Sequence, residues 1–334
     1  MPDTSTNTNL ISQVYAKELD YEIGKMEFFK KFLGPGNIIQ KHVDFTKVKG
    51  STYNYGLAMM MSNDGVTGDN TMAGNEEALT TYNDSVVIDQ LRNAVVLTGR
   101  LDEQKAAYNL RELAKRQLSE WFPDRMERIC VNHLCGVTTE TFPAAGIAPN
   151  AANWLIGNDT TLTAESSLTS SMPFTASHIS KAKIMAMMAS PKIKPVKTDG
   201  GEYYVMFIHP YQVHYLKSDP DWQAKNWFAH DRGLTNPIFT GALGIYDGVV
   251  CHEHDRLYWS STIDSGTLDG ARAVLCGQSA LIYAEGAGPS WDEETRDFGN
   301  KYAACVGKIF GIKKVRYNSK DYATITVSTY APAV

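Results

Sequence analysis

The chain lacks the features of secretory, membrane-spanning and DNA-reading proteins. Its first nine residues are polar, with no basic cluster followed by an apolar stretch, so the sequence predicts no secretory signal. No segment approaches the roughly 18 uninterrupted apolar residues of a membrane-spanning helix, and residues 57–61 form the densest apolar run. The net charge of −5 gives no electrostatic attraction to nucleic acid phosphates. We therefore expect a soluble protein, made in the cytosol, that does not read DNA sequence.

The sequence also lacks the paired cysteines of a disulfide framework or a zinc site. Its five cysteines are an odd number, they are scattered, and no two are spaced as Cys-x-x-Cys. In a reducing compartment, isolated cysteines are typically buried thiols. We expect that state for Cys130, Cys135, Cys251, Cys276 and Cys305.

The residues that are present support a folded core. Of the 334 residues, 43% are hydrophobic and 21% are charged, which excludes a wholly disordered chain, a collagen and a long coiled coil. A chain of this length can bury about three quarters of its surface, in one elaborate domain or two modest ones. Helix and strand patterns mix along it without βαβ regularity, so the predicted fold class is α+β.

The N-terminal part combines a predicted helix with a long polar segment. Apolar residues recur at helical spacing over residues 10–33, and a strand pattern follows over 37–48. Residues 50–90 are then rich in Gly, Asn, Asp and Thr, and six acidic side chains between residues 51 and 98 face a single basic one, Arg92. Long segments of this kind are normally functional or disordered. We interpret this one as an extended acidic arm that reaches off the body, with a floppy surface loop as the alternative.

A long amphipathic helix is predicted next. Thr98 is suited to cap it, and Asp102 lies in the first turn, near the positive end of the helix dipole. We expect the helix over residues 99–121, a kink or a fresh start at Phe122-Pro123 because proline removes a backbone bond, and a continuation to residue 134. The predicted apolar stripe contains Ala107, Leu110, Ala114, Leu118 and Trp121, and the opposite polar face contains Lys105, Glu112, Lys115, Arg116, Ser119 and Glu120.

The remaining segments predict strands and shorter helices. Residues 138–174 have too few apolar side chains for a core and are expected to form loops and short strands. A helix is predicted over 177–188, and the prolines within 191–195 predict a stiff crossing between subdomains. Short helices are expected after His209 and Asp219. Strands are expected at residues 85–88, 202–208, 245–250 and 271–275, and a half-exposed strand at 323–329. Residues 302–312 are apolar, and their pattern does not distinguish a helix from a strand.

A search for catalytic and cofactor-binding motifs finds no complete pattern. Gly307-Lys308 lacks the upstream glycine and the following Ser or Thr of a phosphate-binding loop. Gly286-Ala287-Gly288 lacks the third glycine of a dinucleotide loop, and Gly277-Gln278-Ser279 lacks the closing glycine of a nucleophile elbow. The sequence therefore predicts no catalytic residue, no cofactor-binding residue and no cofactor.

The sequence His-Glu-His-Asp at residues 252–255 is the strongest candidate for chemistry. On a strand, His252 and His254 project from the same face and could share a metal ion with Asp255. A catalytic metal needs a further protein ligand, and no second His-rich motif supplies one, so the alternative is polar residues at an exposed strand end. We predict no metal site here, nor at His209 and His214, which suit the start and the far end of a helix.

Other polar clusters are not predicted to form sites either. The adjacent acids Glu76-Glu77 and Glu293-Glu294 point apart and do not form an acid/base pair by spacing. Asn63-Asp64-Gly65 and Gly68-Asp69-Asn70 have the composition of a calcium loop but not its spaced ligands and terminal Glu. We expect both to be solvated turns.

Three stretches carry a resemblance through their order and spacing. They are residues 94–101 (AVVLTGRL) running into the long helix, 207–216 (FIHPYQVHYL) with 219–222 (DPDW), and 241–249 (GALGIYDGV). Together with the N-terminal arm, the long acidic segment and the long helix, they resemble the major capsid proteins of tailed bacteriophages with the Hong Kong 97-type fold. The amino-acid sequence of these stretches is most similar to the podophage family typified by coliphage N-four. The resemblance covers about residues 10–327.

The resemblance implies a division of the chain into named parts. Residues 138–174, which the common fold does not account for, would be an insertion or a loop, and any scaffold would be a separate protein. The implied parts are an N-terminal arm with an amphipathic helix (1–50), an extended loop (51–97), a peripheral domain with the spine helix (98–194), a mainly axial domain (195–308), and a return to the peripheral domain with a C-terminal strand (309–334).

The function that the resemblance implies is structural. The chain would be a non-enzymatic major capsid protein, made in the host cytoplasm, that self-assembles as pentamers and hexamers into the icosahedral shell of the virion. Its implied partners are other copies of itself, separate scaffolding, portal and decoration proteins, and packaged double-stranded DNA contacted without sequence specificity, with no membrane. Two alternatives stay open: a metal-dependent enzyme built on His252, His254 and Asp255, and a shell-decorating or binding protein. The long loop argues against the second, because a monomer gains little from ordering such an arm.

Overall fold

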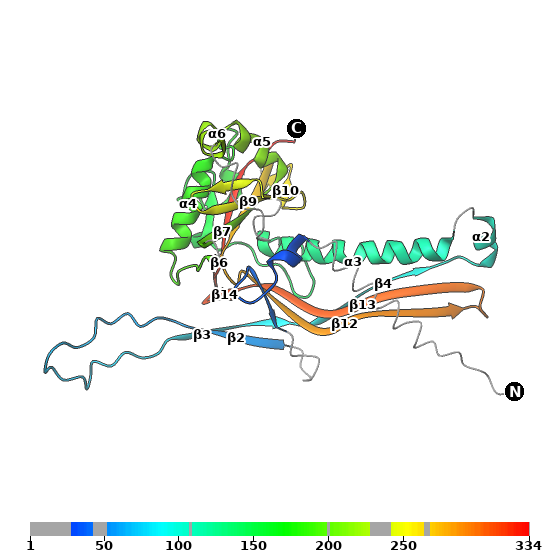
Figure 1. Ribbon diagram of the computed structural model, residues 1–334, viewed down its shortest axis with the longest axis horizontal. Helices are drawn as coiled ribbons and strands as arrows, with labels where there is room; N and C mark the ends of the chain where they lie inside the picture. Colours follow the sequence, from blue (N-terminus) through cyan, green and yellow to red (C-terminus); the bar gives the residue numbers. More distant parts are fainter. Residues whose placement is uncertain are drawn as a thin grey trace.

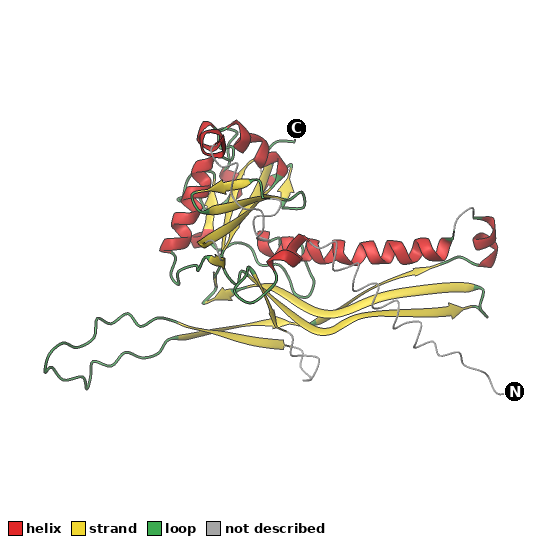
Figure 2. Ribbon diagram, in the orientation of Figure 1, coloured by secondary structure: helices red, strands yellow, loops and turns green. Residues whose placement is uncertain are grey.

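Two parts and a projecting hairpin make up the computed structural model, which describes residues 28–42, 52–106, 109–198, 201–227, 242–263 and 268–333. One part is an elongated layer of strands with a long helix beside it, and the other is a compact part in which helices and strands pack together (Figure 1). Helices and strands mix as the α+β class predicts (Figure 2). The helix expected over residues 10–33 lies outside the described residues except at its end, where η1 (Phe28–Phe32) is a 3-10 helix.

The elongated layer is a four-stranded sheet in the order β1-β12-β13-β4. β12 and β13 form a long antiparallel hairpin, and register shifts on both sides of Ala287 mark bulges in it. The ambiguous segment 302–312 lies within β13. The strands are β1 (Ile39–His42), β4 (Asp89–Val96), β12 (Leu281–Arg296) and β13 (Lys301–Lys314).

The helix beside this sheet, α3, begins later than predicted. It spans Leu110–Cys135, because the side chain of Asn109 caps it by accepting hydrogen bonds from two first-turn amides. Thr98, the expected cap, instead precedes a separate short helix, α2 (Arg100–Lys105), that starts after Gly99. The prediction of one helix from residue 99 was therefore wrong at its start.

α3 also continues through Pro123, where the sequence predicted a kink or a fresh start. The proline removes one backbone hydrogen bond, but Phe122 and Pro123 are both buried, and packing of a buried face stabilises a helix more than one bond does. Leu118 is buried, as predicted. Ser119, which was assigned to the polar face, is buried too, and its hydroxyl donates to the carbonyl oxygen of Arg116.

The compact part is built on an eight-stranded sheet. Six strands follow the order β5-β16-β11-β7-β9-β8, while β6 pairs with β7 and β10 pairs with β11. Three helices belong to this part, α4 (Ala176–Met188), α5 (Pro210–Ser218) and α6 (Pro220–Trp227). The strands are β5 (Trp154–Ile156), β6 (Val196–Thr198), β7 (Gly201–Ile208), β8 (Gly244–Tyr246), β9 (Val249–Glu253), β10 (Trp259–Ser260), β11 (Gly270–Cys276) and β16 (Thr324–Tyr330).

Two expectations about this part are corrected. β16 was expected to be half-exposed because it alternates polar and apolar residues, yet Thr324, Thr326 and Ser328 are buried, because other segments of the chain cover its second face, such as Glu165, which accepts a hydrogen bond from Ser328. Residues 138–174 were expected to contribute no core, yet Phe142 and Phe174 are buried and β5 pairs in parallel with β16. A few large side chains are enough to fill the core beneath a segment that is mostly small and polar.

The strands are grouped differently from the ranges implied by the sequence. The range 195–308 includes β12 and the first half of β13, which lie in the elongated layer, and the range 309–334 includes β16, which lies in the compact part. The chain therefore leaves the compact part through β12 and β13 and re-enters it through β16. One hydrophobic core cluster connects both parts. Among the described helices, none is long and apolar enough to cross a membrane.

Candidate functional site

The structure places the three residues of the candidate metal site in different surroundings, although Oδ1 of Asp255 lies 3.9 Å from Nδ1 of His254. His252 is fully buried in β9, with its ring 5.3 Å from the ring of Phe32 and 6.1 Å from that of Phe207. Asp255, in contrast, exposes 81% of its side chain. The alternative of an exposed strand end is also wrong for both histidines, because β9 lies between β7 and β8 in the sheet and His254 is buried as well.

The imidazole of His254 connects the compact part to α3 through a contact with Glu127. The backbone amide of Arg256 donates to its Nδ1 at 3.2 Å, and its Nε2 lies 2.6 Å from Oε1 of Glu127 in α3. Both ring nitrogens are therefore engaged, and neither offers a lone pair for a metal. In the part of the chain that the structure describes, no three His, Cys, Asp or Glu side chains gather in a way that could hold a metal ion.

The other polar candidates are also engaged in local structure. His209 caps α5, as its position before Pro210 predicted, and burial lowers its pKa to about 4; His214 is exposed. The carboxylate of Glu77 accepts hydrogen bonds from the backbone amides of Ser62 and Asn63, which lower its pKa. The predicted solvated turns at 63–65 and 68–70 are largely exposed.

The cysteines are thiols, as predicted. Four are buried and Cys305 is partly buried. Burial raises the pKa of Cys135 to about 11 and also raises the pKa values of Cys251 and Cys276. Thiols with raised pKa values are poor nucleophiles and poor metal ligands at neutral pH.

The segment interpreted as an extended acidic arm is a hairpin that projects from the body (Figure 1). β2 (Thr52–Ala58) pairs with β3 (Thr81–Val87) in antiparallel fashion. We call residues 52–87 the extended loop and residues 59–80 its tip. The tip exposes large apolar side chains, above all Met60, which is 92% exposed, together with Met61, Met72 and Leu79. Burying such a surface against another molecule would be favourable, because single chains rarely leave large apolar side chains gathered in water.

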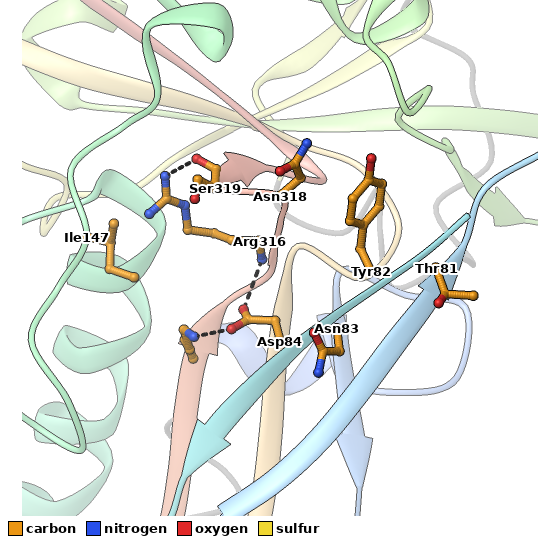
Figure 3. Close-up of a pocket in the computed structure, with 9 residues that line it drawn as sticks. Thr81, Tyr82, Asn83, Asp84, Ile147, Arg316, Asn318 and Ser319 are labelled. Atoms are coloured by element: carbon orange, nitrogen blue, oxygen red, sulfur yellow. Dashed lines mark hydrogen bonds and ion pairs between the residues drawn. The ribbon is translucent and has the colours of Figure 1, made fainter. Parts of the chain in front are cut away.

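The base of the extended loop meets the body in a polar pocket of about 380 Å³ (Figure 3). Asp84 of β3 points toward Lys313 at the end of β13 and toward the turn that joins β14 (Arg316–Tyr317) to β15 (Lys320–Asp321). The pocket is lined by Thr81, Tyr82, Asn83, Asp84, Ile147, Lys313, Arg316, Asn318 and Ser319.

Sequence reasoning missed this base. Asp84 was counted only as one of the acidic residues of the arm, and its partner Lys313 lies 229 positions away. Periodicity reports which face of a strand is covered, but it does not report which distant strand covers it. The only sequence signal for this contact was the apolar segment 302–312 followed by Lys313. That pattern does not identify Asp84 as the partner of the lysine.

The chain is similar to known proteins over nearly its whole length. Residues 4–333 match the family model described as phage capsid protein. The major capsid protein of Pseudomonas phage KPP25 is 30% identical, over 96% of this chain and 95% of that protein. Among solved structures, the capsid of Ralstonia phage GP4 is 28% identical and covers 92% of both chains with a TM-score of 0.80. The capsid of cyanophage Pam1, 24% identical, has the same fold with a TM-score of 0.75 over 92% of both chains.

Proposed function

The chain belongs to the phage capsid protein family, as a major capsid protein that forms the icosahedral shell of the virion, and from this premise we propose how its parts carry out assembly. The extended loop of each copy contacts a neighbouring copy. The observation that carries this proposal is the exposed apolar tip, which has no use in an isolated subunit: Met60, Met61, Met72 and Leu79 gain burial only from another molecule.

The two parts of the subunit correspond, in this proposal, to the two domains of the Hong Kong 97-type fold. The compact part is the axial domain, which packs around five-fold and six-fold centres in pentamers and hexamers. The elongated layer with α3 as its spine helix is the peripheral domain. The pairing of strands supports moving residues 281–314 to the peripheral domain and 324–330 to the axial domain.

The chain performs this work without catalysis. The engagement of His254 with Glu127 and Arg256, and the full burial of His252 among aromatic rings while Asp255 is exposed, give the metal-enzyme alternative no support. Scaffolding, portal and decoration proteins are proposed as separate partners, and packaged DNA as a contact without sequence specificity. Placement in the podophage branch typified by coliphage N-four is also a proposal, supported by the three stretches at 94–101, 207–222 and 241–249; a short tail on the source particles would test it.

Deleting residues 63–75 tests the role of the tip. The deleted segment contributes almost nothing to the core, so the variant is expected to stay folded, with a melting temperature close to that of the wild type. Closed shells should be lost, as measured by sedimentation and electron microscopy.

The matched control replaces Asp69 by Asn in the same exposed segment and should assemble normally. Closed particles in wild-type yield from the deletion variant would show that the tip does not act between copies.

A further inference from the structure

A charged contact ties the extended loop to the body at its base. Lys313 Nζ lies 2.5 Å from Oδ1 of Asp84 and also donates to the backbone oxygen of Ser85 at 2.9 Å. The other carboxylate oxygen of Asp84 accepts from the hydroxyl of Tyr55 at 2.7 Å. It also accepts from the backbone amide of Arg316 at 3.4 Å (Figure 3). One carboxylate thus joins both strands of the extended loop, β13 and β14.

This contact is shielded from water. The side chains of Lys313 and Asp84 are only 19% and 17% exposed. Burial of Tyr55, together with its hydrogen bond to Asp84, raises the pKa of the phenol, so Tyr55 remains a donor to the carboxylate. Charge-assisted hydrogen bonds in such surroundings are strong and directional, and salt screens them less than a surface pair.

Other contacts at the base bring β3 close to β13, and β3 continues through Ile88 into β4, which pairs with β13. β2 and β3 form a two-stranded sheet of their own, separate from the four-stranded and eight-stranded sheets among the described residues. Val86 is buried, and a Cβ atom at Gly311 would lie 2.2 Å from the carbonyl oxygen of Val87, so only glycine permits this approach. Apolar burial is non-directional. The hydrogen bonds of Asp84 and Lys313 are directional, so together with the continuation of β3 into β4 they can set the angle of the extended loop.

A small change of that angle at the base produces a large displacement of the tip. About 15 residues separate Asp84 from the middle of the tip, which is up to about 50 Å of extended chain. A rotation of about 10° at the base would move the tip by roughly 9 Å, about the spacing of two packed layers of protein. Contacts between copies would not survive such a displacement.

We propose that Asp84 and Lys313 are a positioning pair that sets the direction of the extended loop for assembly. The pair acts through the loop and need not contact a neighbouring copy itself. This inference rests on the proposed contact between the tip and a neighbour. It predicts that the contact between Asp84 and Lys313 is needed for the size and closure of the shell more than for the folding of the subunit.

Substitution of both Asp84 and Lys313 distinguishes a role in assembly of the shell from a role in folding of the subunit. In Asp84→Asn/Lys313→Met no charge is left unpaired, so the unassembled subunit is expected to fold. Its closed shells should fall about fivefold or more in yield, with a broader distribution of diameters by electron microscopy. Hydrogen exchange of the unassembled variant should be faster at residues 81–87, while α3 stays protected.

Two further variants serve as controls. Lys313→Arg keeps the cation and should restore wild-type yield and diameter, which a general loss of stability would not explain. Asp89→Asn/Lys301→Met removes one exposed acid from β4 and one half-exposed lysine, which lies 4.0 Å from Asp297, from β13, and it should assemble normally.

Normal yield and diameter of shells from Asp84→Asn/Lys313→Met would overturn the inference. If that variant does not fold, Asp84→Asn alone, which keeps an acceptor for Tyr55, decides by the same measurement. The deletion of 63–75 distinguishes the two proposals: if the deletion abolishes shells while the pair variants assemble normally, only the positioning role fails. If the deletion variant assembles normally, the proposed function of the tip fails first.

Discussion

Single buried polar residues join segments that are far apart in the sequence. Arg272 of β11 donates two hydrogen bonds to the carboxylate of Glu165, at 2.7 and 2.6 Å, and a third to the carbonyl oxygen of Cys135 at the end of α3. Arg125 of α3 makes a similar two-fold contact with Glu140. Sequence reasoning identified none of these pairs, because a charged residue in a loop reads as solvated unless its distant partner is known.

Buried histidine makes the stability of the subunit depend on pH. Burial lowers the pKa of His178 from 6.5 to about 4, and its Nδ1 accepts a hydrogen bond from the amide of Thr175. Between these pH values unfolding takes up a proton, so the free energy of unfolding falls as the pH drops from about 6.5 to about 4, by at most about 1.4 kcal/mol per pH unit for this group.

We expect His178→Asn, which keeps an acceptor for the Thr175 amide, to make this dependence shallower in urea unfolding measured across that range. The exposed His214→Asn is the control and should leave the slope unchanged. Equal slopes in the wild type and His178→Asn would show that His178 is protonated in the folded state.

Phe298 is the clearest case of local backbone strain. It lies in the turn between β12 and β13 with φ of 50°, and it is fully exposed. A bulky side chain in the left-handed region costs free energy that asparagine largely avoids. Phe298→Asn should raise the free energy of unfolding of the unassembled subunit by up to about 1 kcal/mol, measured as a higher melting temperature; a lower one would mean that the ring makes contacts that stabilise the subunit.

At the scale of elements, periodicity located the long helix, its covered face and its C-terminal end, but not its start. The stripe was right at Leu118, which is 1% exposed, while Leu110 is only partly buried because it begins the helix. The start depended on a competition between Thr98 and Asn109 as caps, and continuation through Pro123 depended on burial against the rest of the fold. β16 shows the same limit, since alternation predicts one open face and cannot reveal that other segments cover it.

The two leucines should therefore differ in their effect on stability. Leu118→Ala is expected to lower the free energy of unfolding by about 2–5 kcal/mol, because it leaves a cavity at a fully buried position. Leu110→Ala should cost clearly less. Chemical denaturation of the unassembled variants measures both values, and equal losses would contradict the assignment of the covered face.

At the scale of the whole molecule, exposed apolar side chains lie on α4 of the compact part, at Ile184, Met187 and Met188, and also far from that part. Some are at the tip of the extended loop, and others, including Leu101 and Phe298, lie at the opposite end of the elongated layer (Figure 1). The sequence predicted the projecting arm, because residues 50–90 have too few apolar side chains to fold on their own. It did not predict the direction of the arm, which depends on Asp84, Lys313 and Gly311 meeting across distant strands.

A cryo-electron microscopy reconstruction of the purified shell, at a resolution that traces the chain, tests the central claim most directly. We expect residues 59–80 of each copy to lie against a neighbouring copy, with Met60 and Leu79 buried at that contact and Asp84 still paired with Lys313 of its own chain. A shell in which residues 59–80 fold back on their own subunit, or extend into solvent without touching another copy, would contradict it.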